Sequence, residues 1–405
     1  MNILFVHNNF PAQYKHLVEA LAKEPDCKIA AIGARTAQPM PGVDLHRYDL
    51  EKQDVVLTHP FARRFDLECR RAEQVLYTAS FLAGTGFRPD IIVVHSGWGE
   101  NLPLRAIFPK ARIISYCEFY YRPHGQDVNF DPEFPELSAD GLVALAAKNA
   151  NGLLALIDCD HGLTPTVWQQ STYPKELQSK ISIVHEGVDV DLVRADSNAE
   201  LKLPLGRVLR AGDEIVTFVS RNLEPLRGYH IFMRAIPRIL RERPNAHVVI
   251  VGGDQVSYGA LPPPGTTWKA LYFNEIAGQI DRRRIHFLGH TSYQTYLKVL
   301  QISTAHVYLT YPFVLSWSLV EAMSAECNIV ASDTAPVREL LDNDSASIVS
   351  FFDHAALAAQ VVEILRDPKP FRARAQQARA KVVAAYDAKR ICVPKLRAFL
   401  TASQA

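Results

Sequence analysis

The sequence predicts an α/β protein made of two doubly wound, Rossmann-like domains with parallel sheets. Strand-length runs rich in Val, Ile and Leu alternate with helix-length segments along the chain, and such near-continuous apolar runs are typical of parallel strands buried on both faces. The alternation predicts helices on both faces of each sheet. The pattern occurs twice, on either side of a polar segment at residues 189–212, which predicts two domains.

The individual elements follow from these runs. In the first half, the strand candidates are residues 3–6, 29–32, 91–94, 113–116, 153–157 and 181–184. A helical stretch at residues 11–22 follows the first strand. In the second half, the strand candidates are residues 215–219, 248–251, 285–288, 307–309, 329–331 and 348–349. Residues 372–400 carry many Ala, Arg and Lys residues and predict a long helix.

The polar segment sets the expected domain boundary. Residues 194–198 and 204–206 are polar or turn-forming, as a linker should be. We therefore expect an N-terminal domain at residues 1–195 and a C-terminal domain at residues 196–385. Residues 386–405 are expected to form a C-terminal helix that can pack back on the N-terminal domain.

The composition argues against several classes of protein. Of 405 residues, 48% are hydrophobic and 21% charged, which is typical of a globular chain and not of a disordered one. Lys and Arg number 44 against 43 Asp and Glu, without the basic excess of a nucleic-acid-binding protein. The six cysteines form no C-x-x-C pair, so neither a zinc site nor a disulfide scaffold is indicated. No apolar run approaches the roughly 20 residues of a membrane span, and the start lacks the basic flank of a signal peptide. We expect a cytoplasmic protein, which can still touch the inner face of a membrane.

The strongest chemical signal follows the strand at residues 215–219. The segment at residues 220–228 places Arg221 and Arg227 between that strand and the next helix. Two guanidiniums beside a helix N-terminus suit a diphosphate, because each Arg binds oxygen pairs and the helix end adds free N–H groups. A pair of surface arginines is the alternative interpretation. No G-x-G-x-x-G follows the first strand, so a nicotinamide or flavin site is poorly supported.

A second anion-binding segment follows the strand at residues 307–309. A helix starts there near Ser316, Trp317 and Ser318, and its free N–H groups would point at an anion. Glu321 lies about one turn further on, where a carboxylate could accept hydrogen bonds from vicinal hydroxyls such as those of a ribose. A glutamate favoured by the helix dipole is the alternative for Glu321.

Taken together, these motifs resemble glycosyltransferase family 4, the retaining enzymes of the GT-B architecture, over most of the chain. Residues 220–228 are similar to the family's diphosphate clamp, with Arg227 in place of the usual Lys, and residues 320–323 to the end of its Glu-x7-Glu motif. Residues 287–289 are similar to the family's strand beside the nucleotide base, and residues 183–189 to the segment that leads out of its N-terminal domain. Residues 95–100, 116–122 and 130–134 are similar to the N-terminal domain of one bacterial subgroup.

Two departures from the family pattern stand out. The first Glu of the paired motif falls on Phe313, and in the family that Glu contacts the transferred sugar. Many members also carry a His after the strand at residues 113–115, where this chain has Tyr116, Cys117 and Glu118. The polar groups that face the sugar are therefore rearranged.

The resemblance implies a GT-B fold, with two parallel sheets facing each other across a cleft. It implies transfer of a sugar, with retention, from a nucleoside diphosphate sugar that is UDP- or GDP-linked, without a metal or another cofactor. The acceptor would be a glycan, a lipid-linked acceptor or a protein, as in polysaccharide biosynthesis. Arg221, Arg227 and Glu118 are the expected catalytic residues. The expected donor-binding residues are Asn9, Gly253, Gly289, Ser316, Trp317, Ser318 and Glu321. For Gly253, a glycine that only turns the chain is the alternative.

The acceptor side would belong to the N-terminal domain. Polar and aromatic residues gather there after two strands: His95, Glu100, Glu118, Tyr120, Tyr121, Arg122 and His124. Aromatic rings pack on the apolar faces of sugars, and the polar groups bind hydroxyls. Core packing explains Tyr120 and Tyr121 equally well, and a buried, hydrogen-bonded imidazole explains His95. Glu118 is either a sugar-binding carboxylate or a partner of Arg122.

Two other functions stay open. Phe313 is consistent with a catalytically weakened transferase fold that binds nucleotide or a partner protein. A nucleotide-sugar epimerase of the same architecture is the other, although the Glu321 segment argues against it. Residues 61–71 form a basic, amphipathic stretch, which is either a solvated helix face or a surface for anionic lipid.

Overall fold

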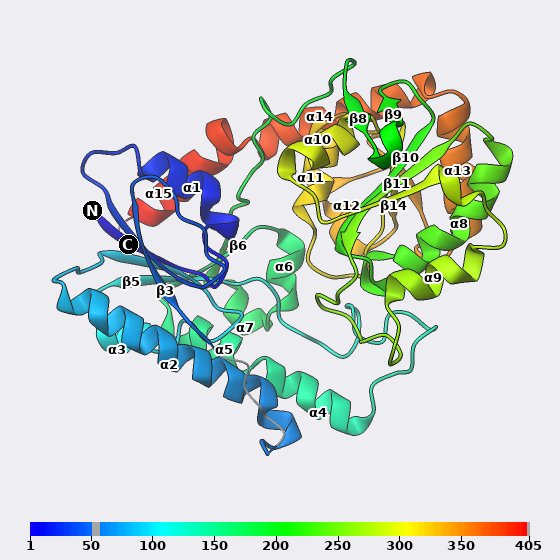
Figure 1. The fold of residues 1–405 in the computed structure, drawn as a ribbon. Coiled ribbons are helices and arrows are strands. Elements are labelled where there is room, and N and C mark those ends of the chain that lie inside the picture. Colours follow the sequence, from blue (N-terminus) through cyan, green and yellow to red (C-terminus); the bar gives the residue numbers. More distant parts are fainter. Residues whose placement is uncertain (51–56, 403–405) are drawn as a thin grey trace. The chain divides into compact units, whose positions relative to one another are not determined.

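The computed structural model describes residues 1–50 and 57–402, and the contacts in it divide the chain into two compact units. Unit 1 comprises Met1–Gly187 and Ala388–Ala405, and unit 2 comprises Val188–Asp387. The division falls after Gly187, ahead of the boundary expected at residues 195 and 196. Residues 403–405 of the expected C-terminal helix lie outside the described residues. Figure 1 shows the elements of both units.

Unit 1 is built on a parallel sheet with the strand order β3-β2-β1-β4-β5-β6-β7 in its described part. The strands are β1 (Asn2–Val6), β2 (Lys28–Ala34), β3 (Val43–Tyr48), β4 (Ile91–His95), β5 (Arg112–Tyr116), β6 (His161–Thr164) and β7 (Ile181–Ile183). The helices are α1 (Lys15–Leu21), α2 (Arg63–Gly84), α3 (Leu104–Ile107), α4 (Ala139–Lys148), α5 (Ala150–Asp158), α6 (Val167–Thr172), α7 (Lys175–Gln178) and α15 (Val393–Thr401).

Alternate side chains of the first strand enter two separate cores, because successive residues of a strand point to opposite faces. Ile3 and Phe5 pack with residues of α1 and α15, whereas Leu4 and Val6 pack with residues of α2, α3 and α5. Helices therefore cover both faces of this sheet (Figure 1).

Unit 2 repeats the plan with a parallel sheet of order β12-β11-β10-β13-β14-β15 and a short antiparallel pair, β8 and β9. The strands are β8 (Glu200–Lys202), β9 (Val208–Arg210), β10 (Ile215–Asn222), β11 (His247–Gly253), β12 (Ile285–Gly289), β13 (Ala305–Tyr308), β14 (Ile329–Ser332) and β15 (Ser347–Val349). The helices are α8 (Tyr229–Glu242), α9 (Trp268–Ile276), α10 (Tyr293–Gln301), α11 (Trp317–Ser324), α12 (Ala335–Leu340), α13 (His354–Arg366) and α14 (Arg372–Ala385). Helices α8, α9 and α13 lie on one side of the sheet, and α10 and α11 lie on the other (Figure 1). The predicted α/β class with doubly wound parallel sheets is confirmed.

Two predicted elements are wrong. Residues 153–157, predicted as a strand, belong to α5, whose buried residues Asn151, Ala155 and Leu156 follow helical spacing. A short apolar run is compatible with either a buried strand or a half-buried helix. The long helix predicted at residues 372–400 is interrupted between α14 and α15, and only α15 packs on the sheet of unit 1.

The strand order fixes where ligands are expected. In each sheet the chain first winds outward in one direction and then restarts on the other side of the first strand, so the order reverses between β1 and β4 and between β10 and β13. Open parallel sheets bind ligands outside the carboxyl ends of the strands at such a reversal. Each unit therefore has one expected site, next to the residues that follow these strands. Among the described residues, no helix combines the length and hydropathy that a membrane crossing requires.

Candidate functional site

Arg227 lies at the reversal point of unit 2, in the short turn between β10 and α8. Its Nη1 donates hydrogen bonds to Oγ1 of Thr310 (2.8 Å) and to the carbonyl oxygen of Val314 (2.9 Å), both in the segment after β13. Nε and Nη2 have no hydrogen-bond partner among residues 1–50 and 57–402. The next residue, Gly228, has φ +70°, and a Cβ there would lie 2.3 Å from Cβ of Leu309. The close approach of these two segments thus fixes one edge of the guanidinium and leaves another edge available for an anion.

Arg221, the other predicted guanidinium, differs from Arg227 in its surroundings. It lies near the end of β10 and is exposed. Within the part of the chain that the structure describes, it makes no hydrogen bond or ion pair. Of the two predicted cations, only Arg227 is therefore fixed before any ligand arrives.

The N-terminus of α11 lies after the same strand as Thr310. Ser316 caps the helix, since its Oγ accepts hydrogen bonds from the N–H and Oγ of Ser318 (3.3 and 2.9 Å). The N–H of Ser316 donates to the hydroxyl of Tyr308 (2.9 Å). Trp317 is about half exposed, whereas Ser318 is buried. Because residues 310–316 connect the Arg227 contacts to this helix end, both belong to one strand-end region that suits an anion.

Glu321 lies in α11 and is held by two tyrosines of α10. The hydroxyl of Tyr293 donates to its Oε1 and that of Tyr296 to its Oε2, both across 2.6 Å. Burial, and then the negative charge of Glu321, raise the pKa of both phenols. The two tyrosines therefore orient the carboxylate within the strand-end region of unit 2.

The predicted glycines lie at strand ends of the same sheet. Gly253 ends β11, and a Cβ there would lie 2.2 Å from Nε2 of His290 and 2.6 Å from Oδ1 of Asn222. A larger residue at this position would displace the side chains of His290 and Asn222. Gly289 ends β12 with φ +63°, and no atom would obstruct a Cβ there.

Sequence reasoning missed Glu224, which is 1% exposed and lies three residues before Arg227. Its carboxylate accepts hydrogen bonds from the N–H groups of Ser257, Tyr258 and Gly259, at 3.2 to 3.4 Å. The loop after β11 is thereby attached to the segment that carries Arg227. A Glu between Leu and Pro has no distinctive sequence signal.

In unit 1, two histidines end neighbouring strands at the reversal point. His7 follows β1 and His95 ends β4, and their ring centroids lie 5.0 Å apart. Burial lowers the pKa of His7 to about 3 and that of His95 well below its usual range. Nδ1 of His7 accepts from the N–H of Asn9 (2.9 Å), and Nδ1 of His95 from that of Gly97 (3.0 Å). Both rings are therefore neutral, with the proton on Nε2. Neither Nε2 atom has a hydrogen-bond partner among the described residues.

Carboxylates and phenols surround these imidazoles. Oε2 of Glu118 lies 3.7 Å from Nε2 of His95. The hydroxyl of Tyr116 donates to Oε1 of Glu186, and Oε2 of Glu186 lies 3.7 Å from Nδ1 of His185. Oε2 of Glu186 and the hydroxyl of Tyr14 are buried and have no hydrogen-bond partner among the described residues. Sequence reasoning missed Tyr14 and Glu186. The cluster presents both donors and acceptors, as a site for hydroxyl groups requires.

Glu100 and the arginines of α2 shape the loop after β4. Glu100 is fully buried and accepts from the hydroxyl of Tyr48 (2.7 Å), and burial raises its pKa to about 7. Arg64 donates to the carbonyl of Gly97 and Arg71 to that of Trp98, both at 2.7 Å. Within the stretch at residues 61–71, these two basic side chains thus bind the loop that follows His95.

The other acceptor-side candidates make different kinds of contact. The ring of Tyr120 packs on Tyr173 (5.9 Å), and that of Tyr121 lies 3.5 Å from Nζ of Lys148. Arg122 donates to the carbonyl of Tyr173 (2.9 Å), which fits a structural role. His124 is exposed.

Asn9 belongs to unit 1, whereas the other donor-binding candidates belong to unit 2. Its Oδ1 accepts from the hydroxyl of Thr36 across 2.6 Å.

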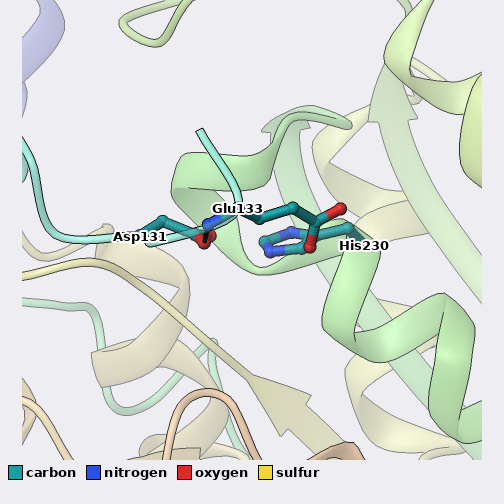
Figure 2. Close-up of side chains that lie close together, drawn as sticks. All are labelled: Asp131, Glu133 and His230. Carbon is teal, nitrogen blue, oxygen red and sulfur yellow. Dashed lines mark hydrogen bonds between the residues drawn. The ribbon is translucent and has the colours of Figure 1, made fainter. Parts of the chain in front are cut away.

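Figure 2 labels two carboxylates of unit 1 and one imidazole of unit 2. Within unit 1, the N–H of Glu133 donates to Oδ1 of Asp131 across 2.9 Å, the hydrogen bond drawn there. Within unit 2, His230 is buried in the first turn of α8 beside the rings of Tyr272 and Phe351. Asp131 thus shapes a turn, and His230 belongs to the core of its unit.

Two family descriptions match this chain. The one for "Glycosyl transferase family 4 group" matches residues 25–193, and the one for "Glycosyl transferases group 1" matches residues 206–382. Among curated relatives, a D-inositol 3-phosphate glycosyltransferase of Mycobacterium ulcerans is 27% identical over 191 residues, which is 46% of this chain and 38% of that protein. A phosphatidyl-myo-inositol mannosyltransferase of Mycolicibacterium smegmatis is 30% identical over 158 residues, or 38% of this chain and 36% of that protein. The matches therefore span well under half the length of these relatives.

Solved structures resemble the whole chain. Sucrose-phosphate synthase from Thermosynechococcus elongatus superposes with a TM-score of 0.72 at 16% identity, covering 98% of both chains. Anabaena Alr3699/HepE in complex with UDP and glucose gives a TM-score of 0.64 at 14% identity, covering 98% of this chain and 99% of that one. At such identities the likeness shows the fold, which is GT-B.

Proposed function

Because this chain belongs to the family 4 glycosyltransferases with the GT-B fold, we propose that it moves a sugar from a nucleoside diphosphate sugar to an acceptor hydroxyl. One observation carries the proposal: Arg227 is held at a sheet reversal with two nitrogens open, beside the segment that leads to the N-terminus of α11. Departure of a diphosphate builds up negative charge, and a fixed cation and helix N–H groups stabilise that charge.

The donor would lie across unit 2. Arg227, Arg221 and the start of α11 at Ser316 to Ser318 would bind the diphosphate, and Glu321 would accept hydrogen bonds from the ribose. Gly289 would leave room for the nucleoside beside β12, and Gly253 would let the imidazole of His290 approach the end of β11. We propose UDP or GDP as the nucleotide, and the UDP held by a structure of the same fold supports UDP.

The acceptor hydroxyl would bind in unit 1 among His7, His95, Glu118 and Glu186. A hydroxyl group both donates and accepts hydrogen bonds, and this cluster offers imidazole N–H donors next to carboxylate acceptors. The neutral rings and the carboxylates suit an uncharged hydroxyl-bearing group, such as a glycan, better than a second phosphate. A free glycan, a lipid-linked glycan or a glycosylated protein would present such a group.

We propose that the reaction retains the anomeric configuration and needs no metal. The leaving diphosphate oxygen would take the proton of the acceptor hydroxyl, so that no protein base is required. Glu118 would orient that hydroxyl as a hydrogen-bond acceptor. We place the reaction in the cytoplasm, at the inner face of the membrane if the acceptor is lipid-linked.

The test is donor turnover by the full chain. UDP- and GDP-sugars are incubated with and without glycan acceptors, nucleoside diphosphate release is measured, and the product anomer is assigned by NMR. We expect acceptor-dependent release that persists in EDTA and yields a product with retained configuration. Nucleotide binding without turnover on any donor would instead identify a binding subunit, and interconversion of donors without an acceptor would identify an epimerase.

A further inference from the structure

The guanidinium of Arg227 is held on a face as well as on an edge. While Nη1 binds Thr310 and Val314, the guanidinium carbon lies 5.7 Å from the ring centroid of Phe313. Phe313 is 1% exposed and Thr310 is fully buried. A cation within about 6 Å of an aromatic face is attracted by the ring quadrupole. The ring is therefore part of the surface that orients Arg227.

The ring of Phe313 also contacts the loop after β11. Its centroid lies 5.1 Å from that of Tyr258, at an interplanar angle of 54°. The backbone of Tyr258 is attached through Glu224 to the segment that carries Arg227. Glu224 thus contacts Tyr258, Tyr258 contacts Phe313, and Phe313 contacts Arg227. Glu224 and Arg227 belong to the same short segment of the chain. An aromatic side chain at position 313 links the two loops beside the guanidinium.

The charge of Arg227 is also uncompensated. Among residues 1–50 and 57–402, no carboxylate forms an ion pair with it, although the family pattern places a glutamate at position 313. The nearby carboxylate of Glu224 is occupied by three backbone N–H groups. The charge of Arg227 is thus left for a ligand to compensate.

We propose that Phe313 is a positioning residue for diphosphate binding, because its ring fixes the guanidinium plane of Arg227. This inference rests on the proposed function, because it assumes that Arg227 binds the diphosphate of the donor. We therefore expect Phe313 to raise the affinity for a nucleoside diphosphate and to leave the affinity for the nucleoside unchanged.

The experiment compares wild type with Phe313→Leu and Phe313→Gln in the full chain. Calorimetry measures the affinities for UDP and uridine, and for GDP and guanosine. We expect Phe313→Leu and Phe313→Gln to weaken diphosphate binding about three- to tenfold, since a cation–π contact of ordinary strength is lost. Nucleoside affinity should not change.

A matched control is Phe218→Leu, which removes a ring of similar burial that stacks on Phe232 at 4.8 Å. Thermal unfolding of all variants separates loss of folding from loss of binding, and the control should keep the wild-type ratio of diphosphate to nucleoside affinity. An unchanged ratio in all Phe313 variants would overturn the inference while leaving the proposed function intact. A wild-type chain that binds neither UDP nor GDP would overturn both.

Discussion

The hydroxyl of Tyr296 donates a hydrogen bond to Oε2 of Glu321 across 2.6 Å, and the carboxylate is thereby oriented from the neighbouring helix. We predict that Tyr296→Phe weakens binding of uridine and UDP, or of guanosine and GDP, by the same factor of about three to ten. The reason is that the lost hydrogen bond orients the group that would bind the ribose, which nucleoside and nucleotide share. Tyr229→Phe, whose hydroxyl makes a longer bond of 3.3 Å to a backbone carbonyl, is the control. Unchanged nucleoside affinity in Tyr296→Phe would remove Glu321 from the ribose site.

Arg227 and Arg221 should differ in their effects. We predict that Arg227→Ala weakens nucleoside diphosphate binding about 10- to 100-fold and nucleoside binding hardly at all, because hydrogen bonds to a charged group are lost. Arg227→Lys should recover only part of this affinity, since an ammonium cannot bind Thr310, Val314 and an oxygen pair with the same geometry. Arg221→Ala should cost less, because the exposed side chain must first be ordered. Calorimetry with the four ligands tests this, and equal loss of nucleoside and diphosphate affinity in Arg227→Ala would exclude a diphosphate clamp.

The fold was largely predictable because buried parallel strands are continuous apolar runs, and most of the predicted strands lie where the structure has them. The prediction of a strand at residues 153–157 was wrong because a short apolar run in a half-buried helix has the same composition as a buried strand. The strand order, and hence the reversal points, depends on contacts between distant segments, which local sequence does not report.

Part of the site was predictable because the order of strands and helices could be predicted. Arg227 and Ser316 lie in the segments that connect β10 to α8 and β13 to α11, so their region could be inferred from the order of the elements. Glu224, Tyr14 and Glu186 could not be found, because their roles depend on backbone groups or rings that are distant in sequence. The role proposed for Phe313 likewise depends on the contacts of its ring with Tyr258 and Arg227, which are distant in sequence.

His7 should make the stability of the protein sensitive to acid. Burial lowers its pKa from 6.5 to about 3, so between these values the unfolded chain binds a proton that the folded chain does not. The stabilisation is present above pH 6.5 and is lost as the pH falls. We predict that His7→Asn reduces the loss of unfolding free energy between pH 7 and pH 5 by about 2 kcal/mol.

Urea unfolding of both proteins at the two pH values measures this difference. Glu100 acts in the opposite direction, because its pKa is raised to about 7 and its contribution is lost as the pH rises. That contribution is common to wild type and His7→Asn, so it cancels in the comparison. Identical pH dependence of the two proteins would mean that the His7 imidazole takes up its proton in the folded state.

Glu118 should act on the acceptor and not on the donor. Its carboxylate lies 3.7 Å from the Nε2 atom of His95, where an acceptor hydroxyl could bridge the two groups. We predict that Glu118→Gln lowers kcat/KM for the acceptor about 10- to 100-fold, since a charged hydrogen-bond acceptor is replaced by a neutral one. Nucleoside diphosphate affinity should stay at the wild-type value. Steady-state kinetics at saturating donor, together with calorimetry, distinguish this outcome from a variant that loses donor binding instead.

The most direct test of the central claim is a crystal structure of the full chain with UDP or GDP bound. We predict that the diphosphate lies against Nε and Nη2 of Arg227 and the N–H groups at the start of α11, with a ribose hydroxyl on Glu321. A nucleotide bound elsewhere in unit 2, with Arg227 still in contact only with Thr310, Val314 and Phe313, would contradict it.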